Sequence, residues 1–281
     1  WLSGTQKEPE KIVDKRQFLK YVLASAVFHG VPDALAFPAG HEKKACPASP
    51  GAAGEKQRPM PVRQSRRISG LGHDAAVKDR LIKSRFFDHV FADDIFLDPG
   101  DMGLLGGSLN RLKRIQRLVG YGNYCLLDFD QALALSKNYP SVGSFPRSEI
   151  CFLEKIFYAN GRDYGFTGEK PIEQITGLIR KKEVRKIPGT GNYLYRGKPM
   201  GVYRRVKKQV GNQMVLTSGV RGVMKQFLLF LDKVARSHGN LSMASRSLAP
   251  PGYSFHGTGD FDVGKKGFGI DNFTEKFVQT G

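Results

Sequence analysis

The sequence is poor in cysteine and tryptophan. Among its 281 residues are three cysteines and one tryptophan, and no two cysteines form a Cys-x-x-Cys pair. A zinc site built from thiolates is therefore not expected. Cys125 and Cys151 both lie among apolar neighbours, which favours two buried thiols; the alternative is a disulfide between them.

Acidic residues are also scarce relative to basic ones. The chain has 44 Lys and Arg against 26 Asp and Glu, so its formal net charge is +18. A positively charged surface favours the binding of polyanions such as nucleic acid, anionic lipid or bacterial wall polymers. With 40% hydrophobic residues, the chain is long enough for one sizeable core and a small additional subdomain.

Long hydrophobic runs are missing, and the apolar run Tyr21–Phe28 is too short to span a bilayer as a helix. It follows the basic segment Lys15–Lys20 and precedes Ala34-Leu35-Ala36, an A-x-A cleavage pattern, and this arrangement is typical of export signals. The Lys15-Arg16 pair resembles a twin-arginine signal. We therefore expect residues 1–36 to be an export signal of a periplasmic or extracellular protein. The alternative is an amphipathic helix of the folded domain.

The next segment, residues 37–70, is rich in Pro, Ala, Gly and basic residues and lacks apolar periodicity. This composition predicts a disordered basic linker. Residues 71–281 are expected to form the folded domain.

Apolar residues at helical spacing dominate the first half of that domain. We expect helices over Ala75–Phe91, from a Ser108 cap to Gly120, over Phe129–Ser136 after an Asp128 cap, over Glu149–Asn160 after a Ser148 cap, and over Pro171–Lys181. Asp93, Asp94, Asp98 and Asp101 lack the regular spacing of a calcium loop, so we expect them in a solvated turn.

The second half shows strand-like alternation. We expect strands over Asn192–Tyr195, Val202–Val206, Gln213–Thr217, Leu241–Ser245 and Asp260–Val263, and a helix over Val223–Ser237. The predicted fold class is α+β, in which a helical amino-terminal half precedes a small, mostly antiparallel sheet that carries the functional site.

One stretch is strongly basic. From Arg180 to Lys208 there are eleven basic residues and one acid, with tyrosines interleaved. Such a mixture can bind single-stranded nucleic acid. No RNA-binding signature accompanies it, so we prefer strands whose basic outer faces contact anionic glycans in an exported protein.

The segment with the most chemistry is Leu248–Val263, which we call the histidine segment. A neutral imidazole and a nearby carboxylate can share one Zn²⁺ where the backbone between them turns tightly. Gly257 and Gly259 permit such a turn. We expect His256 and Asp262 to be metal ligands, with Asp260 as a competing ligand. The alternative is a glycine-rich hairpin with an exposed histidine and solvated acids.

The histidine segment resembles the zinc D-alanyl-D-alanine carboxypeptidase and dipeptidase family, the M15 peptidases, which share a hedgehog-like fold. Ser254, His256, Gly259 and Asp262 occupy the places of the family's Ser-x-His-x-x-Gly pattern and following Asp. In the family this Asp usually lies one residue further from the His. Asp260 therefore remains a competing candidate for the metal ligand.

A second segment, Thr217–Gln226, resembles the family's Ser-Gly-x-Arg-x-x-x-x-Gln pattern, and we call it the arginine segment. The resemblance implies that Arg221 is catalytic, through a substrate carboxylate or a tetrahedral oxyanion. It further implies that Ser218, Gln226 and Ser254 bind substrate. The alternative for Arg221 is an ordinary surface cation.

The resemblance implies a Zn²⁺ enzyme that cleaves peptidoglycan stem peptides beside a free carboxylate. The family also uses a second His and a Glu base, in Glu-x-x-His or Glu-Pro-Trp-His, and no histidine follows His256. We therefore expect the given chain to stop before that element, to bind zinc weakly and to be inactive by itself. The alternatives are a non-catalytic wall-binding relative and, less favoured because of the export signal, a nucleic-acid-binding protein. The expected partners are peptidoglycan peptides and an anionic cell-wall or membrane surface; no nucleic acid is expected.

Overall fold

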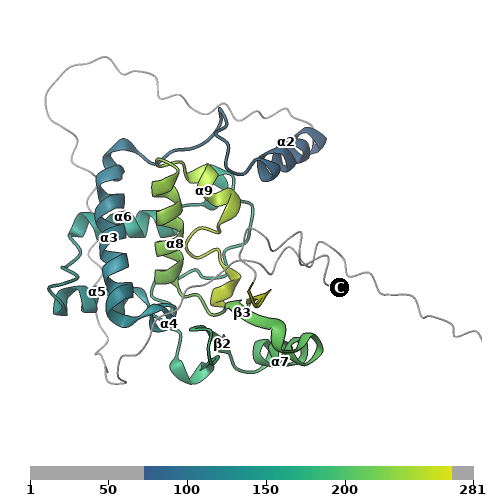
Figure 1. Cartoon of the computed structure of the whole chain (residues 1–281). Coiled ribbons are helices and arrows are strands. Elements are labelled where there is room, and N and C mark those ends of the chain that lie inside the picture. Colours follow the sequence, from purple (N-terminus) through teal and green to yellow (C-terminus); the bar gives the residue numbers. More distant parts are fainter. Residues whose placement is uncertain (1–72, 268–281) are drawn as a thin grey trace, which may run out of the picture. The chain divides into compact units, whose positions relative to one another are not determined.

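The computed structural model describes residues 73–267 of the chain. The expected export signal and basic linker lie outside these residues. The fold is α+β, as expected: the described residues form eight α-helices and two small antiparallel sheets (Figure 1). They divide into two compact units, each with its own core. The helical unit comprises residues 73–179 and 221–258, and the sheet unit comprises residues 180–220 and 259–267.

The helical unit is built around α8. Its helices are α2 (His73–Arg85), α3 (Met102–Val119), α4 (Tyr121–Tyr124), α5 (Phe129–Asn138), α6 (Arg147–Tyr158), α8 (Val223–Arg236) and α9 (Leu241–Ser247). α8 packs against α3, α5 and α9. Met224, Phe227 and Phe230 on α8 are completely buried, because they lie on the apolar face of this amphipathic helix.

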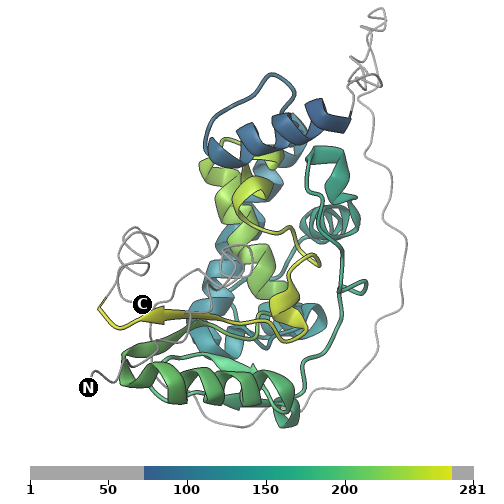
Figure 2. The ribbon, with the colours of Figure 1, turned by 90° about the vertical axis from the view of Figure 1, so that its right-hand side faces the viewer.

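The sheet unit contains both sheets and one helix. Its elements are β1 (Val184–Lys186), β2 (Tyr193–Tyr195), α7 (Lys198–Val210), β3 (Met214–Ser218) and β4 (Asp262–Lys265). β1 pairs with β2 and β3 pairs with β4, so the expected single sheet is two two-stranded sheets. α7 lies along β2 and buries Met200 and Tyr203 in the core of this unit (Figure 2).

Several expected elements agree with the structure. Asp128 caps α5: its carboxylate accepts the Gln131 backbone N–H at 2.8 Å, and its own N–H donates to the Gln131 side chain at 3.4 Å. Gly120, at φ 81°, ends α3. The expected strand over Gln213–Thr217 and helix over Val223–Ser237 correspond to β3 and α8.

Two expected strands are helices. Val202–Val206 lies within α7, where Pro199 stands in the first turn and the buried Met200 and Tyr203 are three residues apart. Leu241–Ser245 lies within α9, because the Asn240 side chain accepts the Met243 backbone N–H at 2.7 Å and caps a helix.

The expected helix over Pro171–Lys181 is absent from the structure. Ile172 donates its backbone N–H to Gly252, and Gly177 closes a turn back to Gln174. Ile175 and Ile179 are buried from an irregular segment. Their spacing of four residues is the same as on one face of a helix. The backbone hydrogen bonds of the segment, however, run to a distant loop and to a local turn.

Three expectations about individual polar residues are also wrong. Ser108 does not cap α3 but lies in its interior, because the helix begins at Met102. The cap of α6 is Pro146, so Ser148 lies inside that helix. Asp94 is not solvated: its side chain is 1% exposed and forms an ion pair with Arg246.

Candidate functional site

In the sheet unit, the arginine and histidine segments are joined by a strand pair. β3 and β4 run antiparallel, with Met214 opposite Lys265 and Ser218 opposite Asp262. The register shifts between Leu216 and Ser218, so the ladder is irregular at the end that carries the candidate residues. Ser218 and Asp262 are both buried, at 6% and 3% exposure.

In the helical unit, the same two segments are joined by hydrogen bonds. The backbone N–H of Arg221 donates to the His256 carbonyl at 3.2 Å. The Arg221 guanidinium donates to the Gln226 side-chain oxygen at 3.5 Å, and the Gln226 amide donates to the Ala249 carbonyl. Two segments that are separated in the sequence therefore meet in each unit.

Glycines on either side of Arg221 allow close backbone contacts. A Cβ on Gly219 would lie 2.1 Å from the Tyr193 carbonyl oxygen, and one on Gly222 would lie 3.0 Å from that of Cys125. The Gly222 backbone N–H donates to this Cys125 carbonyl at 2.7 Å. Since no larger residue fits at Gly219 without displacing backbone, the turn that presents Arg221 depends on it.

The backbone around His256 is similarly constrained. His256 lies in a single 3₁₀ turn, Phe255–Gly257, and a Cβ on Gly257 would lie 2.3 Å from a methyl group of Ile172. Gly259, at φ 134°, has a conformation that L residues rarely adopt. The tight turn expected between His256 and Asp262 is therefore present. Ser254 is buried, and Asp260 is exposed.

Sequence reasoning missed a buried cation on the first turn of α8. Lys225 is 7% exposed, and its ammonium donates to the Gln116 side chain at 3.1 Å. It also lies 4.5 Å from the centre of the Tyr121 ring. Burial lowers the pKa of Lys225. No sequence signal indicated these contacts, because Gln116 is 109 residues away.

Two acidic groups beside these cations are uncharged at neutral pH. Burial raises the pKa of Tyr121 to about 12 and the pKa of Cys125 to about 11. Arg221 acts electrostatically on both groups. Its positive charge is thus not offset by this phenol or this thiol at pH 7. Cys125 is a free, buried thiol, as expected, and does not pair with Cys151. The same expectation for Cys151 is wrong, because Cys151 is disulfide-bonded and only partly buried.

The candidate metal ligands are fewer than a zinc site needs. Catalytic zinc generally has three protein ligands. Across residues 73–267, no group of three or more His, Cys, Asp or Glu side chains could hold a metal ion. His256 belongs to the helical unit and Asp262 to the sheet unit. The described residues therefore do not by themselves form a complete zinc site.

Comparison with known proteins gave no relative. No family model, no curated protein and no solved structure matches the chain. Among the described residues, no helix is both long and apolar enough to cross a membrane.

Proposed function

We propose that the protein is a zinc peptidase of the D-alanyl-D-alanine carboxypeptidase type, exported to act on peptidoglycan stem peptides. The observation that carries this proposal is the contact between the arginine and histidine segments. Arg221 donates its backbone N–H to the His256 carbonyl, and Gln226 bonds both to the Arg221 side chain and to Ala249. The backbones of Arg221 and of the candidate metal-binding His256 are thereby held next to each other.

Arg221 is the proposed catalytic residue. A guanidinium stays charged at all working pH values and binds carboxylates through two parallel hydrogen bonds. Gln226 accepts from this guanidinium and is itself 1% exposed, so it restrains the orientation of Arg221. In this position Arg221 suits either the free carboxylate of the substrate or the oxyanion that forms during hydrolysis. Ser218 and Ser254 are proposed to bind substrate.

His256 and Asp262 are the proposed metal ligands. When bound, Zn²⁺ would polarise the scissile carbonyl and lower the pKa of a water molecule. A third ligand and a general base must come from outside residues 73–267. Asp262 is preferred to Asp260 because it starts β4 and is 3% exposed, whereas Asp260 is solvent-exposed.

The experiment measures D-alanine release by protein expressed from the complete gene and supplied with zinc. The substrate is diacetyl-Lys-D-Ala-D-Ala, and the control peptide carries a carboxyl-terminal amide. We expect release from the acid, little from the amide, and none by His256→Ala. This substitution keeps the carbonyl that accepts from Arg221, so it removes the imidazole and leaves that backbone contact in place.

The outcomes separate two functions. No release and no peptide binding would contradict the proposal. Binding of the acid without release would instead indicate a non-catalytic wall-binding relative, which the shortage of metal ligands in the described residues favours as the second candidate.

A further inference from the structure

The sheet unit carries a group of exposed cations without counter-ions. Their side chains form no ion pair or hydrogen bond within the described part of the chain. The group consists of Arg185, Lys186, Arg196, Lys198, Arg204, Arg205 and Lys208. Exposed positive charges at this density repel one another and favour an anionic partner.

In the helical unit several cations have carboxylate partners, although others, such as Arg80, Arg117 and Arg162, are exposed and unpaired within the described residues. Arg111 pairs with Glu149 at 2.8 Å, and Lys113 pairs with Asp232 at 2.7 Å. Arg246 pairs with Asp94. Within residues 73–267, such pairing with carboxylates is absent from the seven cations of the sheet unit.

α7 presents the densest part of this charge. It carries five Lys and Arg residues and no acid over Lys198–Val210. Met200 and Tyr203 face the core, whereas Arg204, Arg205 and Lys208 are exposed. Arg204 and Lys208 are four residues apart, so they are neighbours on the helix surface, where like charges destabilise a helix. We call Arg204, Arg205 and Lys208 the α7 cationic face.

Little in the sheet unit could add apolar contacts to this charge. Among the described residues of the sheet unit, Val210 is the only large hydrophobic residue that is exposed, at 52%. Tyr203, the aromatic residue of α7, is buried, so the α7 cationic face itself offers no ring to stack on nucleotide bases. The apolar side of α7 is buried, so the helix cannot lay an apolar face into a bilayer. A partner of the α7 cationic face is therefore recognised mainly by charge.

We propose that the α7 cationic face binds a linear, phosphate-bearing polymer, the chemistry of polyol-phosphate wall polymers. A flexible chain of phosphates follows exposed cations without needing bases to stack or acyl chains to bury. This inference does not depend on the peptidase proposal, because it uses none of the candidate site residues.

The experiment titrates the full chain with linear polyphosphate over a range of salt concentrations. The test variant is Arg204→Gln/Arg205→Gln/Lys208→Gln, and the matched control is Arg80→Gln/Arg117→Gln/Arg162→Gln, which removes three exposed cations from the helical unit. Both variants lose the same charge. We expect the test variant to bind about tenfold or more weakly, with a salt slope shallower by about 2, as the loss of three phosphate contacts requires. The control should change little.

Equal losses in both variants would overturn the proposal, since net charge alone would then explain binding. Duplex DNA and mixed phosphatidylglycerol–phosphatidylcholine vesicles are tested at equal phosphate concentration. Tighter binding to either one would overturn the assignment to a phosphate polymer in favour of nucleic acid or membrane. Far-UV circular dichroism checks folding, and the three single substitutions replace any triple variant that fails to fold.

Discussion

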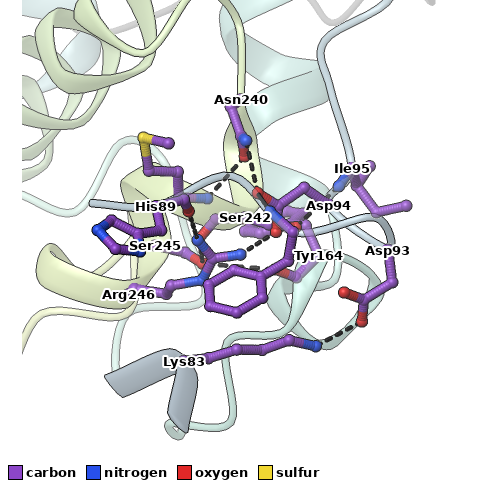
Figure 3. Close-up of polar contacts among 12 residues, drawn as sticks. Lys83, His89, Asp93, Asp94, Ile95, Tyr164, Asn240, Ser242, Ser245 and Arg246 are labelled. Atoms are coloured by element: carbon purple, nitrogen blue, oxygen red, sulfur yellow. Dashed lines mark hydrogen bonds and ion pairs between the residues drawn. The ribbon is translucent and has the colours of Figure 1, made fainter. Parts of the chain in front are cut away.

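Asp94→Ala should strongly destabilise the helical unit, because Asp94 is the centre of a buried polar cluster (Figure 3). Its carboxylate accepts from the Arg246 guanidinium, from the Asn240 amide at 2.7 Å and from the Phe91 backbone N–H at 3.1 Å. The Asp94 side chain is 1% exposed. The cluster therefore connects the segment after α2 to the amino-terminal end and last turn of α9.

The expected loss follows from what the alanine leaves behind. The Arg246 side chain is 10% exposed, also donates to the His89 carbonyl at 2.7 Å and lies 4.6 Å from the centre of the Phe91 ring. Removing one partner of a buried ion pair costs about 3–5 kcal/mol of unfolding free energy. Because Arg246 keeps some contact with solvent, we expect a loss near the lower limit, about 3 kcal/mol.

The adjacent residue provides a matched control. The Asp93 side chain is 68% exposed and pairs with Lys83, whose hydrogen bond holds the pKa of Asp93 below its usual value. Asp93→Ala should change the stability at pH 7 by less than about 1 kcal/mol, as for an exposed pair. Urea unfolding, monitored by far-UV circular dichroism, measures the unfolding free energy of both variants. Equal changes for Asp93→Ala and Asp94→Ala would refute the reasoning.

Two further predictions concern reactivity and metal binding. Since burial raises the pKa of Cys125 to about 11, the thiol is protonated below that pH, and roughly one molecule in a thousand carries the thiolate at pH 8. Iodoacetamide should modify Cys125 only after unfolding, and rapid modification of the folded protein at pH 8 would show that the thiol is accessible. For zinc, measured after dialysis by atomic emission, His256→Ala and Asp262→Ala should each lose metal whereas Asp260→Ala retains most of it. A larger loss in Asp260→Ala would make Asp260 the ligand.

Elements with strong local signals could be predicted from the sequence. Asp128 caps α5 as expected, and Gln131, three residues further on, completes a capping box. α8 was predictable because its apolar residues recur at helical spacing over four turns. Short elements could not be predicted in the same way. A few alternating residues in α7 and α9 fit a strand as well as a helix, and the deciding features were Pro199 and the Asn240 cap.

The candidate site likewise contains residues that the sequence indicated and residues that it did not indicate. Arg221 and His256 stood out because glycines and a recognisable spacing surround them, and the structure joins their backbones. Lys225 did not stand out, because its burial depends on Gln116 and Tyr121, which are far away in the sequence. Contacts of this kind follow from packing between helices and leave no local pattern.

The most direct test of the proposed site is the rate of D-alanine release by Arg221→Lys in the zinc-supplied protein from the complete gene. Lysine keeps the positive charge and the backbone N–H that donates to His256, but it lacks the planar fork of the guanidinium. We predict unchanged zinc content and a rate lower by about a hundredfold or more, the scale of a lost oxyanion donor. A rate within a few fold of the unsubstituted protein, at equal zinc content, would contradict a catalytic role for Arg221.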